Sequence, residues 1–185
     1  MVLYGVRIGD MPPGEMTWYL DQFQCQEYKE KTWVINYSFR SGVHPETNKH
    51  YGGDGRTAFI PDTEEGREIL ALLVLSFKRR LTFTVGFSVV RGCDNCIVWN
   101  GVHHKTRPSG GSTHYGYPDD TYFNRVRQEL ALKGVVFATE EEKNREVELV
   151  TKRESRVVIE KEKVGQKKKG KAAMPDFANF RIPGM

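Results

Sequence analysis

The stretch IPDTEEGREILALLVLSFKRRL, residues 60–81, decides the fold class because it carries the clearest helical pattern in the chain. Residues of one predicted helix face recur every three or four positions: Ile69, Leu72, Leu73, Ser76 and Phe77. Asp62 is the predicted N-cap, with Glu65 three residues later. Arg79 and Arg80 suit the C-terminal end of a helix dipole. The pattern predicts a helix whose apolar stripe belongs to the core.

Strand patterns stand on both sides of this helix. Residues 31–39, KTWVINYSF, alternate and are rich in β-branched and aromatic side chains. Residues 81–90 and 96–102 are two β-rich runs separated by RGCDN, which predicts a hairpin. Residues 119–135 predict a second helix that stops at Gly134. Together these elements predict an α+β fold, a single compact domain with a mainly antiparallel sheet and two main helices.

Two segments rich in Gly and Pro are interpreted as loops. GDMPPGEM, residues 9–16, is typical of a turn, because its prolines fix φ and its glycines allow a tight backbone conformation. In residues 40–56 the glycines close to Arg56 could form a phosphate cradle. A surface loop is the favoured interpretation, since no Gly-Lys-Ser/Thr ending follows and surface loops are commonly rich in glycine.

The composition changes at Ala138. The chain has 185 residues, and residues 138–185 carry 12 Lys and Arg against 9 Asp and Glu, which leaves 16 against 15 for the first 137. We therefore predict a domain over residues 1–137 and a charged, partly helical or disordered extension over 138–185. In the extension Thr139 and Glu142 make a capping-box pattern, and RVVIE, residues 156–160, could instead be an edge strand.

Composition also limits which partners and which cellular compartment we expect for the protein. No run approaches about 18 apolar residues, and the first residues lack the layout of a secretory signal. We expect an intracellular protein, cytoplasmic and/or nuclear, with no membrane partner. The first 137 residues are nearly neutral, and binding to a phosphate backbone needs clustered cations. We therefore assign any polyanion contact to the Lys-rich stretch GQKKKGKAA, residues 165–173.

Three cysteines are too few for a disulfide framework. Cys93 and Cys96 have the C-x-x-C spacing of zinc and redox sites, with His103 and His104 downstream. Because Cys93 and Cys96 fall at the predicted hairpin turn and His103 at the far end of a strand, ordinary turn residues are the favoured interpretation and no metal site is predicted. A double zinc module of the RING kind needs about eight Cys and His ligands, more than this chain offers.

WNGVHHKTRPSGGSTHYGYPDD, residues 99–120, gathers titratable and aromatic side chains in a predicted loop. Consecutive His103 and His104 at a strand end point to opposite faces, so one can face a cleft while the other serves the structure. Tyr115 and Tyr117 offer ring faces with hydroxyl tips, and Glu129 supplies a carboxylate from the next helix. The residues alone leave two interpretations open, a functional His/Tyr/Glu cluster and loop histidines satisfied by the structure.

Four blocks of the chain resemble the Deltex C-terminal domain, the last module of Deltex-type ubiquitin ligases. They are GDMPPGEM, residues 51–88, VWNGVHHKT and YGYPDDTYFNRVRQELALKGV, and they stand in that family's order and near its spacing. The resemblance covers about residues 5–137. It implies a compact α+β domain with a groove for ADP-ribose, either free in NAD or attached to a modified protein or nucleic acid, and no further cofactor.

The resemblance also implies an activity. In full-length relatives an adjacent RING domain recruits a ubiquitin-charged E2, and the pair joins the ubiquitin C-terminus to a hydroxyl of the adenine-side ribose of ADP-ribose or NAD. Because no RING is predicted here, the RING and the charged E2 would act in trans. The alternative is a non-catalytic, stand-alone reader of ADP-ribosylated partners.

The family's catalytic positions fall on His103, Tyr115 and Glu129 of this sequence. We expect His103 to position the ribose, Tyr115 to give a hydroxyl or stacking contact, and Glu129 to act as general base or orienter. Some relatives carry a second His where this chain has Tyr115. The residues expected to line the pocket are Thr84, Gly86, Ser88, Asn100, His104 and Tyr117, with Gly86 allowing close backbone approach.

Overall fold

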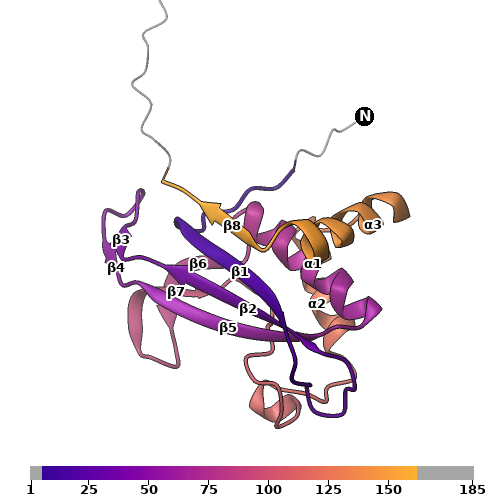
Figure 1. Ribbon diagram of the computed structural model, residues 1–185. Helices are drawn as coiled ribbons and strands as arrows, with labels where there is room; N and C mark the ends of the chain where they lie inside the picture. Colours follow the sequence, from indigo (N-terminus) through magenta and orange to yellow (C-terminus); the bar gives the residue numbers. More distant parts are fainter. Residues whose placement is uncertain (1–5, 162–185) are drawn as a thin grey trace, which may run out of the picture.

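An antiparallel four-stranded sheet lies at the centre of the computed structural model, which describes residues 6–161 (Figure 1). Its strands, in spatial order, are β5 (Asp54–Pro61), β2 (Thr32–Phe39), β1 (Gly14–Asp21) and β8 (Arg156–Ile159). Two short hairpins stand beside it, β3 (Gly42–Val43) with β4 (His50–Tyr51), and β6 (Phe83–Ser88) with β7 (Cys93–Trp99). The mainly antiparallel α+β fold that the sequence predicts is confirmed.

Helix α1 (Glu64–Lys78) buries the apolar stripe that its spacing predicted. Its N-cap differs from the prediction. The Thr63 side chain accepts the backbone N–H of Gly66 at 2.9 Å, whereas Asp62 lies one residue further out and accepts the Trp33 indole N–H at 2.8 Å. The prediction of Asp62 as the cap was wrong because the helix begins one residue later than the pattern implied.

Strand β1 overlaps the segment predicted as a turn. Pro12 and Pro13 precede the strand, but Gly14 already pairs with Ile159 of β8. Met16 and Trp18 are buried on one face of the sheet, whereas Tyr19 on the other face is exposed. The alternation of large apolar side chains from Met16 onward was the available signal for this strand.

The β6–β7 hairpin forms where the two β-rich runs predicted it. The cysteines near its end differ from the prediction. The sulfurs of Cys93 and Cys96 are joined in a disulfide, so the interpretation of both as ordinary turn residues was wrong. Cys25 is the free cysteine of the described residues; it is buried, and burial raises its pKa.

Helix α2 (Tyr122–Leu132) confirms the second predicted helix, and Gly134 follows it with a φ of +76°. The composition boundary at Ala138 falls between α2 and α3 (Glu140–Glu148). Thr139 caps α3 by accepting the N–H of Glu142, and the π-helical turn η2 (Leu149–Arg153) leads into β8. Both elements offered for this segment, helix and edge strand, are therefore present.

The part after Ala138 is joined to the rest of the molecule. β8 pairs with β1, and the indole N–H of Trp18 donates to the Val150 carbonyl at 2.7 Å. Figure 1 shows α3 alongside α1 on the same side of the sheet. The Lys-rich stretch lies outside the described residues. No helix within residues 6–161 is long and apolar enough to cross a membrane.

Candidate functional site

His103 and Glu129 are brought together by helix α2. The carboxylate of Glu129 accepts the backbone N–H of His103 at 2.7 Å, and its other oxygen lies 2.5 Å from the ring Nδ1. One face of the same helix also presents Tyr122, whose hydroxyl donates to the His103 carbonyl at 2.9 Å. His103 is thus bonded through its backbone N–H, its backbone carbonyl and its ring Nδ1.

This bonding decides which ring nitrogen is available. A carboxylate only accepts hydrogen bonds, so Nδ1 carries the hydrogen that it donates to Glu129. In the neutral ring Nε2 therefore keeps its lone pair, and the His103 side chain is 66% exposed while that of Glu129 is 21% exposed. An exposed imidazole acceptor backed by a carboxylate can take a proton from a bound hydroxyl.

His104 points to the other side and serves the core. Its Nδ1 donates to the Val102 carbonyl at 2.9 Å, the Tyr37 hydroxyl donates to its Nε2 at 2.7 Å, and its ring stacks on Trp99. Burial lowers the pKa of His104 to about 4, so the ring is neutral at pH 7. The expectation that His104 lines a ligand pocket does not fit this position, because both ring nitrogens are already bonded inside the protein.

The two tyrosines of residues 99–120, Tyr115 and Tyr117, also differ. Tyr117 is fully buried, its hydroxyl donates to the Phe59 carbonyl at 2.8 Å, and burial raises its pKa well above the ordinary value. Its side chain is therefore part of the core and does not line an open pocket as expected. Tyr115 follows the 3-10 helix η1 (Ser112–His114) with a φ of +59° and is 65% exposed. No hydrogen bond or ring contact joins Tyr115 to His103 or Glu129 in the described part of the chain.

The remaining expected pocket residues lie on or beside the β6–β7 hairpin. Thr84 donates to the Asp10 carboxylate, Ser88 accepts the N–H of Arg91, and the side chain of Asn100 donates to the Leu81 carbonyl. Gly86 is different, because a Cβ placed there would meet only Val98, at an ordinary contact distance of 3.5 Å. The packing of the protein itself therefore leaves room for a side chain at position 86.

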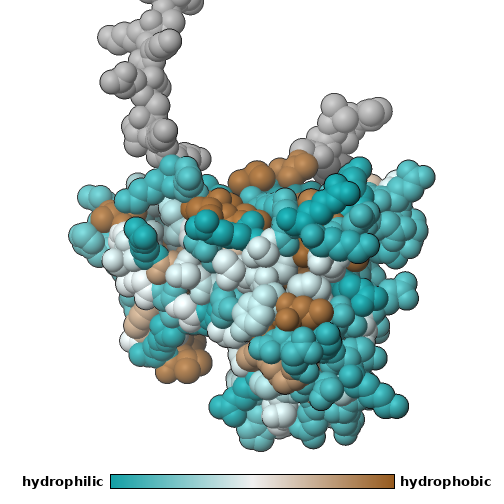
Figure 2. Space-filling model, in the orientation of Figure 1, coloured by the Kyte–Doolittle hydropathy of each residue, from teal (hydrophilic) through white to brown (hydrophobic). Residues whose placement is uncertain are grey.

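Figure 2 shows the surface indented between the tip of the β6–β7 hairpin and the lobe that contains η1. The tip is apolar, with Phe87, Val89 and Val90 exposed. Two further hollows lie elsewhere. One, of about 760 Å³, borders α3 and η2, and the other, of about 770 Å³, lies between α1 and α2. Neither is lined by His103, Tyr115 or Glu129. The candidate site is therefore identified by the chemistry of the His103 and Glu129 pair and not by the volume of a hollow.

An ion pair that sequence reasoning missed anchors the loop after His103. Lys105 donates to the Asp119 carboxylate at 2.6 Å, with both side chains 5% exposed, and Arg125 reaches the same oxygen at 2.7 Å. Burial acts to raise the pKa of Asp119, but the bonds from Lys105 and Thr121 outweigh it and lower that pKa. The acidic pair before α2 was a visible signal, whereas nothing in the local sequence marks Lys105 as buried.

The same loop closes along the edge of β5. The Phe59 N–H donates to the Lys105 carbonyl at 2.9 Å, and the Phe59 carbonyl accepts the Tyr117 hydroxyl. Gly116 is required inside the loop, since a Cβ there would lie 1.9 Å from the Ser109 carbonyl oxygen. The loop that carries His103 is therefore tied to the central sheet.

Arg56, offered above as part of a phosphate cradle, pairs with Asp54 at 2.5 Å. Within residues 6–161, no three His, Cys, Asp or Glu side chains gather closely enough to hold a metal ion.

Comparison with known proteins adds to this geometry. A family model described as the Deltex C-terminal domain matches residues 8–135. The human protein named probable E3 ubiquitin-protein ligase DTX3 is 42% identical over 139 residues, 71% of this chain and 40% of that protein. Mouse E3 ubiquitin-protein ligase DTX4 is 38% identical over 140 residues, and human E3 ubiquitin-protein ligase DTX1 is 36% identical over 140 residues, each match covering 72% of this chain and 23% of the relative. The chain thus spans less than half the length of these curated relatives.

Proposed function

The chain belongs to the Deltex C-terminal domain family, and we propose that it binds ADP-ribose, free or within NAD or an ADP-ribosylated partner, beside His103 and Glu129. The support from the structure is one relationship, the carboxylate-backed imidazole with its free Nε2 on the surface. We infer that the ligand occupies the indentation between the β6–β7 hairpin and the η1 lobe, where Gly86 of β6 would allow close backbone approach.

The proposed reaction transfers ubiquitin to a ribose hydroxyl. The hydroxyl gives its proton to His103 Nε2 while its oxygen attacks the carbonyl carbon of the thioester that joins ubiquitin to the E2 cysteine. The carbon–sulfur bond breaks, and the departing thiolate receives the proton from the imidazolium. The product is an ester between the ubiquitin C-terminus and the ribose.

Glu129 acts as the orienter in this scheme. Both of its oxygens are bonded to His103, so it holds the ring in the tautomer that leaves Nε2 as the acceptor and stabilises the imidazolium that forms. This favours the orienter role over direct proton abstraction by the carboxylate. Tyr115 is free to give a stacking or hydroxyl contact from its exposed position.

The RING domain and the charged E2 are proposed to be supplied from outside the residues that match the family. The relatives are named E3 ubiquitin-protein ligases, and the part of them that this chain matches is less than half their length. The proposal therefore assigns to this chain the ligand groove and the proton acceptor, and to its partners the thioester.

Calorimetric titration of the full chain with ADP-ribose and with NAD tests the binding step. The variant His103→Ala should lower the affinity by about tenfold or more, which corresponds to about 1.4 kcal/mol. The matched control is His50→Ala, an exposed histidine on β4. If folded wild-type protein binds neither compound, or if both variants behave alike, the proposed ligand site is wrong.

A second assay tests the transfer. The chain is mixed with E1, E2, ubiquitin, ATP, a separately purified RING domain and ADP-ribose, and the product is tested for cleavage by hydroxylamine, which breaks esters. A hydroxylamine-sensitive product that His103→Ala fails to form supports the reaction. Binding without any transfer would instead identify a stand-alone reader of ADP-ribosylated partners.

A further inference from the structure

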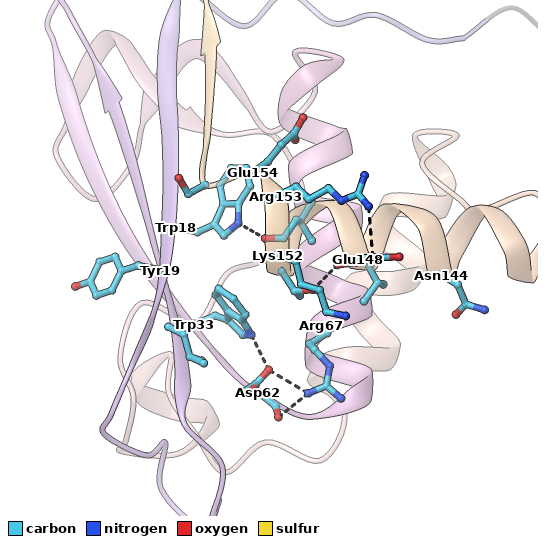
Figure 3. Close-up of a pocket in the computed structure, with 15 residues that line it drawn as sticks. Trp18, Tyr19, Trp33, Asp62, Arg67, Asn144, Glu148, Lys152, Arg153 and Glu154 are labelled. Carbon is cyan, nitrogen blue, oxygen red and sulfur yellow. Dashed lines mark hydrogen bonds and ion pairs between the residues drawn. The ribbon is translucent and has the colours of Figure 1, made fainter.

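The hollow of about 760 Å³ that borders α3 and η2 lies against the sheet, between the start of α1 and the α3–η2 segment (Figure 3). The large apolar side chains of its floor come from three elements: Trp18, Leu20, Trp33 and Val147. Its other walls carry polar side chains, among them Arg67 of α1 and Asn144 and Lys152 of the α3–η2 segment. This combination of an apolar floor and polar walls is typical of binding sites.

The edge of β1 is open at this hollow. The N–H of Trp18 donates to the Ser155 carbonyl at 3.0 Å, and beyond this bond the chain leaves β1 and turns into η2. Backbone groups two residues apart in a strand point to the same side, so the N–H and C=O of Leu20 also face away from β2. In the part of the chain that the structure describes, neither has a hydrogen-bond partner.

The charge that remains unpaired on the walls is positive. Each lining carboxylate has a basic partner: Asp62 with Arg67 at 3.1 Å, Glu148 with Arg153 at 3.7 Å, and Glu154 with Lys78 at 3.0 Å. Lys152 is exposed and has no ion-pair partner within residues 6–161. An occupant with a carboxylate near Lys152 would give this lysine an ion-pair partner.

We propose that this hollow binds an extended, acidic segment of a partner protein, which adds a strand to β1 alongside Leu20. The segment's backbone would bond to the N–H and C=O of Leu20, an apolar side chain would enter the floor formed by Trp18, Leu20 and Trp33, and an Asp or Glu side chain would meet Lys152. Strand addition takes its affinity from the backbone and its selectivity from side-chain pockets.

The wall of this site lies beyond the matched domain. The family match ends at residue 135, whereas α3 and η2 start at Glu140 and Leu149. The π-helical turn exposes the Val150 carbonyl to the Trp18 indole, which fixes that ring in the floor. The segment after Ala138 therefore completes the site on a floor from the matched domain, and the hollow is not lined by His103 or Glu129.

The test selects a displayed library of random peptides on the full chain and measures the affinity of the enriched peptides by calorimetry. We expect enriched peptides to alternate apolar residues with Asp or Glu. Lys152→Glu, which reverses the unpaired charge, and Asn144→Trp, which fills the hollow from its rim, should each weaken binding by about tenfold or more. The matched control Lys49→Glu, on the exposed β3–β4 turn, should leave the affinity unchanged.

Amide hydrogen exchange distinguishes strand addition from other binding modes. In the free chain the Leu20 amide should exchange fast, and a bound peptide should slow it by about tenfold or more because the N–H gains an acceptor. No enriched peptide, peptides indifferent to both hollow variants, or binding without Leu20 protection would each overturn the proposal. Protection in the free chain would also overturn it: if it rises with protein concentration the occupant is a second copy, and if it does not the chain fills the hollow itself.

Discussion

Glu129 bonds to His103 at two atoms, the backbone N–H and the ring Nδ1, across 26 residues of sequence. The backbone bond places the residue and the ring bond chooses the tautomer, so position and protonation are set by one carboxylate. Tyr122, seven residues before Glu129 on α2, adds the bond to the His103 carbonyl. Helix α2 therefore determines how the exposed imidazole is presented.

Glu129→Gln should separate binding from transfer. The amide keeps the shape of the side chain but lacks the charge that stabilises an imidazolium, so ubiquitin transfer should fall by about 100-fold or more. ADP-ribose affinity should change by less than about threefold, since His103 remains in place. Single-turnover rates and calorimetry measure the two effects, with the exposed Glu141→Gln on α3 as control. An equal loss of binding and transfer would contradict the division of roles between His103 and Glu129.

The two cations on Asp119 should differ in their effect on stability. Lys105→Met removes a partner that is 5% exposed and leaves a buried carboxylate short of its bond, which should lower the free energy of unfolding by about 3 kcal/mol. Arg125→Met acts on the same oxygen from a side chain that is 46% exposed and should cost less than about 1 kcal/mol. Urea denaturation of both variants tests the order, and similar losses would show that burial of the Lys105 pair is not what matters.

Two glycines should respond oppositely to alanine. Gly86→Ala places a Cβ at ordinary contact distance from Val98, so stability should change by less than about 1 kcal/mol. If a ligand approaches the backbone at this point, ADP-ribose affinity should fall by about tenfold. Gly116→Ala drives a Cβ into the Ser109 carbonyl and should lower the melting temperature. Unchanged affinity in a folded Gly86→Ala variant would remove residue 86 from the ligand site.

His104 should make the fold sensitive to mild acid. Its pKa is about 4 in the folded state and near 6.5 when unfolded, so between these values the unfolded chain binds more protons and stability falls as pH falls. From pH 7 to pH 5 the loss from this residue should reach about 2 kcal/mol. Urea denaturation across this range measures it.

A variant checks that the loss belongs to His104. His104→Gln cannot titrate, so it should be less stable at pH 7 but lose less on going to pH 5, while His50→Ala should follow the wild type. The carboxyls with lowered pKa values, Glu15, Asp54 and Asp119, lose their contribution mainly at lower pH and do not mask this window. Parallel pH profiles for wild type and His104→Gln would show that burial of His104 is not the cause.

The sequence by itself determined the elements with a strong local period. Helix α1, helix α2, strand β2 and the β6–β7 hairpin follow from the spacing of apolar side chains, because a helix repeats near 3.6 residues and a strand at two. The ordered blocks also pointed to the family that the comparisons show. His103 and His104 do face opposite ways, but both lie beyond β7, which ends at Trp99, so the period of a strand did not by itself decide their directions.

Only the tertiary structure decided which histidine faces solvent, and which partners each one has. His104 turns inward because Tyr37 and Trp99, far away in sequence, form the core around it, and this leaves His103 outside against α2. The buried Lys105 and the strand β8 that closes part of β1 have the same origin. A local pattern specifies which faces an element has, but the partner that covers each face is set by how the whole chain packs.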